Sequence, residues 1–367
     1  MGMTGSGKST FVATCTGQPY QLVGHGLDSF TRGVSLHTLA RLGVRVHLVD
    51  TPGFDDNRRS DVDVLRELAF WLSQAYRSGI RLCGIIYLQR VTDVRLSGTA
   101  LRALDAFKQM CGPEAFAGVT LLTTGWGLVN HDEHLRALAG ARQAELERTH
   151  RFWGEILAKG GRSAALPPGQ QEALDAVDDI VRCRQSLVLG IQIEMAVESM
   201  TLRETGAGQV LCEAYRLDNA KLEKDVATVQ AELARAIRQC HDQDIRRLRG
   251  AEAELTRNLK RIAEGLRRLE IPVRDVVTRG AEQAEQQTRE LVRLAEGLDD
   301  TRHRDPPPRQ AARGESQTLE ATDARAVQKV HLPSMALAQK VVTGSSVLSA
   351  LAGTASLALT AAACSIM

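Results

Sequence analysis

The stretch that decides the fold is GMTGSGKS, residues 2–9, at the start of a chain of 367 residues. It has the pattern G-x-x-x-x-G-K-[ST], in which the glycines let successive backbone N–H groups turn toward phosphate oxygens. The lysine adds a positive charge at the β- and γ-phosphates, and the serine hydroxyl is placed to bind Mg²⁺. A helix that begins at Ser9-Thr10 points the positive end of its dipole at the same anion. A chance glycine-rich turn is the alternative. The pattern predicts a phosphate-binding loop made of Gly2, Thr4, Gly5, Ser6, Gly7, Lys8, Ser9 and Thr10.

Two further segments predict the rest of a phosphate site. Residues 44–49 (VRVHLV) have a strand pattern and run directly into DTPG, residues 50–53. In P-loop nucleotide hydrolases the Asp of D-x-x-G holds Mg²⁺ and the Gly N–H meets the γ-phosphate, roles we assign to Asp50 and Gly53; a simple turn is the alternative. Between the two elements lies a loop with several glycines, residues 24–33. Thr31 is its best candidate for a further Mg²⁺ ligand and Ser29 the second. The alternative is that Thr31 is only a surface hydroxyl. The predicted metal ligands are Ser9, Thr31 and Asp50.

Strand and helix patterns alternate along the first half of the chain. Helical spacing covers 61–76, 101–110 and about 133–158, and apolar strand patterns cover 82–88 and 119–124. Such alternation predicts an α/β fold, a mostly parallel sheet with helices on both faces and ligands at the carboxyl ends of its strands. A phosphate loop normally follows a buried strand, and only Met1 precedes this one. We therefore expect the first strand of the sheet to be missing, through a late start or a truncated copy.

Four stretches together resemble the fungal G-domain proteins, septin-like relatives of the immunity-associated and chloroplast-import GTPases. They are MTGSGKSTF (3–11), GHGLDS (24–29), DTPGFDD (50–56) and GIIYL (84–88), and the resemblance covers about residues 1–205, including Phe152-Trp153 and the segment 201–205. It implies a P-loop GTPase (G) domain over 1–205, with Mg²⁺-dependent GTP binding. It also implies slow intrinsic hydrolysis, often controlled by self-association.

The base side departs from that family. GTPases select guanine with [NT]-K-x-D after the fifth strand, where this chain has TTGW at 123–126, without the Lys or the Asp. Thr124 and Trp126 are the candidate nucleotide contacts, and an indole stacks on a base with little regard to its identity. Guanine preference therefore rests on resemblance, and use of ATP or of both nucleotides is the alternative. Phe54 replaces the water-orienting Gln or His of faster enzymes. The catalytic residue is unknown, and hydrolysis should be slow.

Residues 206–298 predict a helical region. Two blocks of apolar residues follow four-three spacing and slip out of phase near 241–244, which predicts a coiled coil with a discontinuity. We expect it to pair two copies of the chain; a single charged helix lying on the G domain is the alternative. The two blocks are Leu222, Val226, Val229, Leu233, Ala236 and Cys240, then Leu248, Leu255, Leu259, Ile262, Leu266 and Leu269.

The rest of the chain predicts a flexible linker over 299–334 and an apolar tail over 335–367. No charged residue follows position 340, and this uncharged stretch is long enough to span a bilayer. Because it consists mostly of Ala, Ser, Thr and Gly, its free energy of membrane insertion is close to zero. Its last four residues, CSIM, fit the C-a-a-X prenylation motif. Three alternatives follow for the tail: it spans a membrane, it contacts a membrane through a prenylated Cys364, or it is packed or disordered. The first two exclude each other.

Composition narrows the function classes. The net charge of +2 argues against nucleic-acid binding driven by bulk electrostatics. Seven cysteines without C-x-x-C spacing are typical of reduced cytosolic thiols, and a phosphate loop at residue 2 leaves no room for a signal peptide. The sequence thus predicts a cytoplasmic GTP- and Mg²⁺-binding switch or assembly protein, with a peripheral location on membranes as an alternative. It is expected to form homo-oligomers through its G domain and coiled coil. A base-indifferent NTPase or ATPase and a nucleotide-free coiled-coil scaffold are the alternatives.

Overall fold

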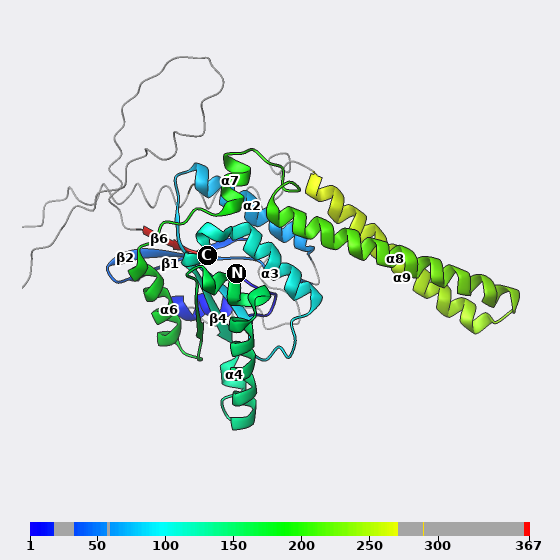
Figure 1. The fold of residues 1–367 in the computed structure, drawn as a ribbon, viewed down its shortest axis with the longest axis horizontal. Helices are drawn as coiled ribbons and strands as arrows, with labels where there is room; N and C mark the ends of the chain where they lie inside the picture. Colours follow the sequence, from blue (N-terminus) through cyan, green and yellow to red (C-terminus); the bar gives the residue numbers. More distant parts are fainter. Residues whose placement is uncertain (18–32, 57–58, 271–288, 290–362) are drawn as a thin grey trace, which may run out of the picture. The chain divides into compact units, whose positions relative to one another are not determined.

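The computed structural model describes residues 1–17, 33–56, 59–270, 289 and 363–367. Among these residues, six strands form one sheet in the order β1-β2-β6-β3-β4-β5 (Figure 1). Only β1 and β2 pair antiparallel, and all other neighbours are parallel, as the alternating pattern predicts. The strands are β1 (Ser35–Arg41), β2 (Val44–Asp50), β3 (Leu82–Arg90), β4 (Val119–Thr124), β5 (Arg162–Ala165) and β6 (Ala363–Ile366).

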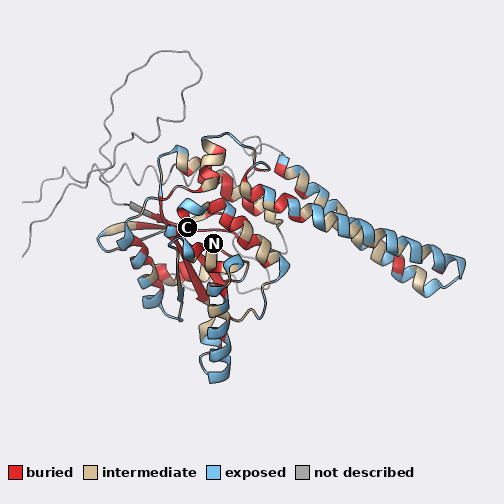
Figure 2. Ribbon diagram, viewed as in Figure 1, coloured by how far each residue is buried: buried red, intermediate tan, exposed pale blue. Residues whose placement is uncertain are grey.

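Helices cover both faces of this sheet. Along β3, Ile85 and Tyr87 pack with α2, α3 and α7 on one face, while Ile86 and Leu88 pack with α1 and α6 on the other. Because both faces are covered, β3 is buried along nearly its whole length (Figure 2). The helices are α1 (Lys8–Thr16), α2 (Asp61–Arg77), α3 (Gly98–Cys111), η2 (Pro113–Gly118), η3 (Trp126–Leu128), α4 (Glu133–Arg148), η4 (His150–Gly154), α5 (Glu155–Ala158), α6 (Gln170–Cys183), α7 (Gly190–Ala196), α8 (Gly206–Arg238) and α9 (Asp242–Glu270).

The long helix predicted for 133–158 is interrupted. α4 ends at Arg148, and η4 is a π-helical turn that leads into α5. A π turn rotates the residues that follow it relative to the preceding helix. Here the turn contains Trp153, which is fully buried in the main core, so the interruption accompanies the burial of the largest side chain in this segment.

The central place in the sheet, where the sequence predicts a missing first strand, is filled by another part of the chain. β6, from the far end of the chain, lies between β2 and β3, in the central place where that strand was expected. In this arrangement Ser365, Ile366 and Met367 are buried, so a lipid-attaching enzyme reaches the CSIM motif only when β6 leaves the sheet. The proposed linker 299–334, the tail before residue 363, and Thr31 with its loop lie outside the described residues, as does nearly all of 271–298.

The two blocks of the predicted coiled coil pair with each other in one chain. α8 and α9 run side by side as a helical hairpin, and the slip in the apolar pattern is the turn between them, where Cys240 has a φ of 56° (Figure 1). The apolar positions of both blocks up to Ala236 and from Leu248 on are at least partly buried, whereas Cys240, in the turn, is exposed. Glu252, a polar residue at the four-three position between Leu248 and Leu255, accepts a hydrogen bond from Gln230 across the pair at 2.8 Å.

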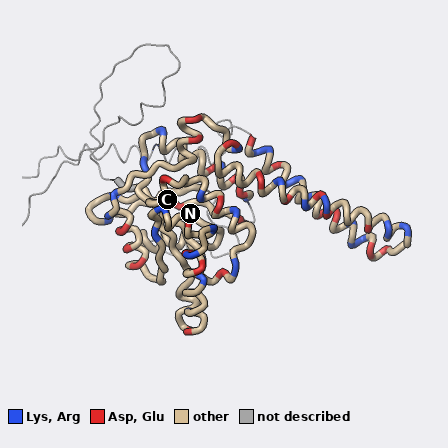
Figure 3. Tube along the Cα trace, viewed as in Figure 1, with Lys and Arg blue, Asp and Glu red and all other residues tan. Residues whose placement is uncertain are grey.

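The base of this hairpin belongs to the main core. Leu211 of α8 and Leu269 of α9 lie in the same cluster as the helices that cover the sheet. Gly265 allows close packing, because a Cβ there would lie 2.7 Å from the Tyr215 ring, and Arg268 donates to both carboxylate oxygens of Asp63 on α2 at 2.8 Å. Farther out, both signs of charge alternate along the helices (Figure 3). No helix among the described residues is both long and apolar enough to cross a membrane.

Truncating Leu269 to Ala should lower the free energy of unfolding by about 2–5 kcal/mol, because it opens a cavity where the hairpin joins the core. Leu217→Ala is the matched control: Leu217 lies on the same hairpin but is 63% exposed, so its loss should change stability by less than about 0.5 kcal/mol. Urea unfolding of both variants measures the difference. Equal effects would mean that the hairpin base does not pack as described.

Candidate functional site

The loop of residues 2–9 leaves the centre of the sheet and enters α1. Gly2 pairs in parallel with Leu88, and Met3 pairs with Phe54 just after the DTPG segment. Gly5 and Gly7 have φ values of 77° and 95°, a region that glycine adopts without strain. Gly7 is the N-cap of α1, so the helix begins with its free N–H groups at the loop. This is the backbone of the phosphate-binding loop that the sequence predicts.

Lys8 is buried beneath that loop. Its Nζ donates to the carbonyl oxygens of Gly2 at 3.1 Å and Met3 at 2.8 Å. Burial lowers the pKa of Lys8 to about 8, against the opposing effect of the Asp50 and Asp56 carboxylates. A buried cation whose charge is only partly compensated favours the approach of an anion.

Gly53 lies directly against the loop. A Cβ at this position would lie 2.6 Å from Thr4 Oγ1 and 2.7 Å from Lys8 Nζ. The backbone N–H of Thr4 donates to the Phe54 carbonyl at 2.8 Å, which ties the two segments together. The structure therefore brings the two predicted phosphate elements into contact and requires a glycine at their junction.

The predicted metal ligands Ser9 and Asp50 meet. Ser9 Oγ donates to Asp50 Oδ2 at 2.7 Å, although the two residues are 41 positions apart. Ser9 lies in the first turn of α1, and Asp50 is the last residue of β2 and is buried. A hydroxyl and a carboxylate oxygen are ligands that suit Mg²⁺, an ion that usually keeps several waters and adds phosphate oxygens.

Three hydroxyls at the site fit an anionic ligand. Among the described residues, the Oγ atoms of Thr4, Ser6 and Thr51 are buried without a hydrogen-bond partner. Buried polar atoms in this condition are rare, and each calls for an explanation. Together with Lys8 and the glycine-shaped backbone, they fit a phosphate chain, and the Ser9–Asp50 pair fits its magnesium ion.

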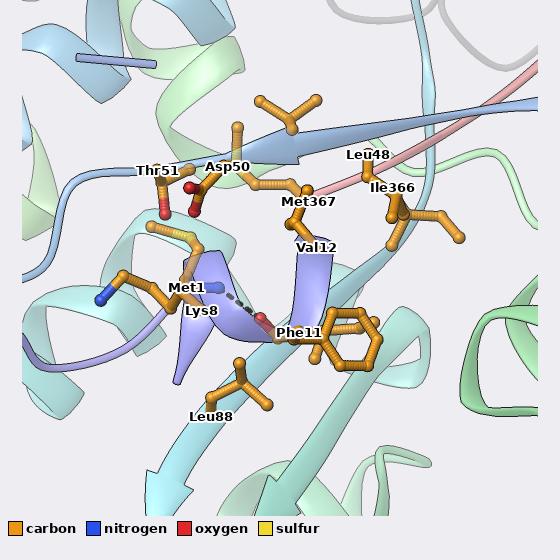
Figure 4. A pocket seen from close by; sticks show the side chains of 12 residues that line it. Met1, Lys8, Phe11, Val12, Leu48, Asp50, Thr51, Leu88, Ile366 and Met367 are labelled. Carbon is orange, nitrogen blue, oxygen red and sulfur yellow. Dashed lines mark hydrogen bonds between the residues drawn. The ribbon is translucent and has the colours of Figure 1, made fainter. Parts of the chain in front are cut away.

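A small cavity of about 30 Å³ lies under the loop (Figure 4). Its lining comes from α1, β2, β3 and both described ends of the chain, with Lys8, Asp50 and Thr51 among the polar members. The volume suits one or two waters and is far too small for a nucleotide. The cavity thus belongs to the support of the phosphate loop.

Thr124 and Trp126, the predicted contacts on the base side of the nucleotide, make hydrogen bonds within the protein. Thr124 Oγ1 donates to the Ser6 carbonyl at 2.8 Å, so it supports the phosphate loop from below. The Trp126 indole N–H donates to Thr123 O at 3.1 Å, and its ring packs beside Val91, Val129 and Ala139. Asp132, the first aspartate after TTGW, is the N-cap of α4, where it accepts from the Leu135 N–H.

Phe54 and Asp55, the first two residues after DTPG, both have structural contacts. Phe54 is buried in the main core. Asp55 accepts from Thr99 Oγ1 at 3.1 Å, and its N–H donates to Asp61, so it joins the start of α2 to α3. The catalytic group therefore stays unassigned.

Sequence reasoning missed Arg90. Its guanidinium lies beside the loop, since a Cβ at Gly5 would be 3.3 Å from Nη1, and it pairs with Asp93 at 3.0 Å. Arg90 is the last residue of β3, and ligands of parallel sheets bind at the carboxyl ends of the strands. A basic residue at that strand end is the signal that could have indicated it.

Comparisons with known proteins find similarity to parts of this chain. No protein-family model matches the chain. GTP-binding protein A of Dictyostelium discoideum is 25% identical over 124 residues, which are 34% of this chain. The match covers only 26% of that protein, so it bears on one segment of the relative and not on its whole activity.

Crystal structures of Toc33 from Arabidopsis thaliana match part of this chain. They include a dimerization-deficient mutant, a complex with GDP and Mg²⁺, and a complex with Mg²⁺ and GMPPNP. Identity is 16–18%, the match covers 52% of this chain and 85% of Toc33, and the TM-score is 0.41. A similarity of this size assigns no ligand to the chain.

Replacing Gly53 by Ala should lower the melting temperature, because the new methyl group would overlap Thr4 and Lys8. Gly98→Ala is the control: Gly98 is the first residue of α3, and a Cβ there meets nothing within 4 Å. We expect the control to melt at or slightly above the parent temperature, since Ala restricts the unfolded chain. Scanning calorimetry of the three proteins tests this, and an unchanged Gly53→Ala protein would contradict the described junction.

Proposed function

We propose that this chain is a Mg²⁺-dependent GTP-binding protein with slow hydrolysis that self-association stimulates, acting in the cytoplasm as a switch or assembly protein. The observation that carries the proposal is the 2.7 Å contact of Ser9 with Asp50 beside a buried lysine and a glycine-built loop. These groups come from two segments far apart in the sequence, residues 2–9 and the DTPG segment, and together they suit one site for a triphosphate and a divalent cation.

Each residue has a distinct task in this proposal. Lys8 exchanges its carbonyl partners for phosphate oxygens, and the N–H groups at the start of α1 bind the same anion. Ser9 and Asp50 hold the metal, and Gly53 lets its N–H approach the terminal phosphate. Bound Mg²⁺ supplies charge neutralisation to the phosphate oxygens. Slow hydrolysis is supported by Phe54, which is buried in the main core and stands where faster enzymes carry a water-orienting Gln or His.

Guanine preference is supported by one comparison. The partial relative from Dictyostelium discoideum carries the name GTP-binding protein A. A base-indifferent NTPase is the second candidate, because Trp126 and Thr124 make their polar contacts within the protein and no aspartate stands at the expected base position. The alternative of a nucleotide-free scaffold predicts that a GTP analogue produces no heat of binding in calorimetry.

Self-association through the G domain stays part of the proposal. The hairpin α8–α9 already pairs its own apolar seam, so a homo-oligomer built on this region would use the outer faces of the hairpin. Exposed apolar residues on it include Leu217 and Ile237. Light scattering with and without GTP analogue would show whether nucleotide changes the mass of the particle.

Lys8→Ala should weaken binding of a fluorescent GTP analogue by about 10- to 100-fold, because a charge-assisted contact to phosphate is lost. Lys221→Ala, which removes an exposed lysine of α8, is the control and should bind like the parent. Equal affinities of Lys8→Ala and the parent would end the nucleotide-binding proposal.

The same probe separates the two nucleotide candidates. We expect unlabelled GTP to displace it at a concentration at least about 10-fold lower than ATP, a difference of about 1.4 kcal/mol. Displacement at equal concentrations of both nucleotides would favour the base-indifferent NTPase.

A further inference from the structure

The last described residues of the chain lie in a slot between β2 and β3. β6 pairs in parallel with β2 from Arg45↔Ala363 to Leu48↔Ile366. On the other side it pairs with β3, where Gly84 lies opposite Ile366. The strand therefore satisfies backbone groups of two neighbours that would otherwise face each other across a gap.

The two described chain ends lie close together (Figure 1), and both pair with β3. The Met367 N–H donates to the Gly84 carbonyl at 3.1 Å, and the Met367 carbonyl accepts from the Ile86 N–H at 2.6 Å. The next bonds of the ladder belong to Met1, whose amino group donates to the Ile86 carbonyl and whose carbonyl accepts from the Leu88 N–H at 2.9 Å. Residues 363–367 and 1–2 thus follow one strand path, which continues into the phosphate loop.

The register leaves one position between the two ends. In a parallel ladder, a residue that bonds to the carbonyl of i−1 and the N–H of i+1 lies opposite residue i. Met367 therefore lies opposite Ile85, and Met1 lies opposite Tyr87. The position opposite Ile86 lies between them, and no residue of the described chain occupies it.

The cavity under the loop agrees with this register. Met1 and Met367 belong to the core cluster that contains Ile85 and Tyr87. Because side chains alternate along a strand, the intermediate position faces the other cluster, which contains Ile86, Leu88 and Ile366. The cavity of about 30 Å³ lies there, and its lining includes Phe11, Val12, Leu48, Ile86, Leu88, Ile366 and both terminal methionines (Figure 4).

We propose that the slot between β2 and β3 is a binding site for an extended peptide segment, which residues 363–367 of the same chain occupy as an inserted strand. Backbone pairing on both sides provides affinity, and the buried Ile366 and Met367 provide selectivity, as in β-strand addition. Occupancy holds β2 at its distance from β3 and so supports the Ser9–Asp50 contact. Only this last consequence rests on the proposed function.

Hydrogen exchange on the unaltered chain tests occupancy without nucleotide. We expect the amides of residues 365–367 to exchange as slowly as those of β3, because both belong to one ladder. Exchange of these amides at the rate of a free peptide, with β3 still protected, would overturn the proposal. Protection that appears only in dimers separated by size would also overturn it, since the strand would then come from a second copy.

Circularly permuted chains test the strand path. Met367 is joined to Met1 through one added residue, and the chain is opened between residues 334 and 335. With Val as the joining residue, the side chain fills the cavity, so the melting temperature should exceed that of the Gly-joined chain by about 2–4 °C. An Asp joint places a charge in the apolar cluster and should melt lowest.

Two results of the permutation would overturn the proposal. One is failure of all three permuted chains to fold, and the other is equal melting of the Val and Asp versions. Both readouts, backbone exchange and melting, are independent of nucleotide. A chain that passes them and binds no GTP would contradict the proposed function alone.

Discussion

The separation of β2 and β3 is the constraint on which the phosphate site depends. Asp50 ends one of these strands, and the loop of residues 2–9 begins beside the other, where Gly2 pairs with Leu88. With one strand between them, β2 and β3 are held about 10 Å apart. At that spacing α1 brings Ser9 to the Asp50 carboxylate. The strand in the middle is therefore as important to the site as the residues of the loop.

Local patterns were sufficient to predict much of the fold and which segments meet at the loop of residues 2–9. The helix at 61–77 follows from its apolar spacing, and the strand at 119–124 follows from a short apolar run. The contact of Ser9 with Asp50 was expected because each residue stands in a motif with a fixed place at a strand end. Gly53 was expected to sense phosphate, and it lies against Lys8.

Other features depend on partners that no local pattern reveals. The segment ACSIM is too short to show periodicity, and its contact with Cys83 joins residues 282 positions apart. The apolar seams of α8 and α9 were recognised, but pattern alone does not distinguish pairing between copies from pairing within one chain. Arg90 was missed because a single basic residue after an apolar strand is a common event.

The helical hairpin is attached to helices of the domain that carries this site. Its base packs with α2 and α3 through Leu211 and Leu269, and Arg268 binds Asp63 on α2, the helix that follows the DTPG segment. The hairpin is therefore anchored on the helix that follows the DTPG segment.

The central claim is that Ser9 and Asp50 act together on one metal ion, and a double-mutant cycle tests it most directly. Affinity for a GTP analogue is measured across a Mg²⁺ titration for the parent, Ser9→Ala, Asp50→Asn and the double variant. If both residues hold the same ion, each single change removes most of the Mg²⁺-dependent affinity, and the double variant loses little more. Independent, additive losses, or affinities that do not depend on Mg²⁺ in the parent, would contradict the account.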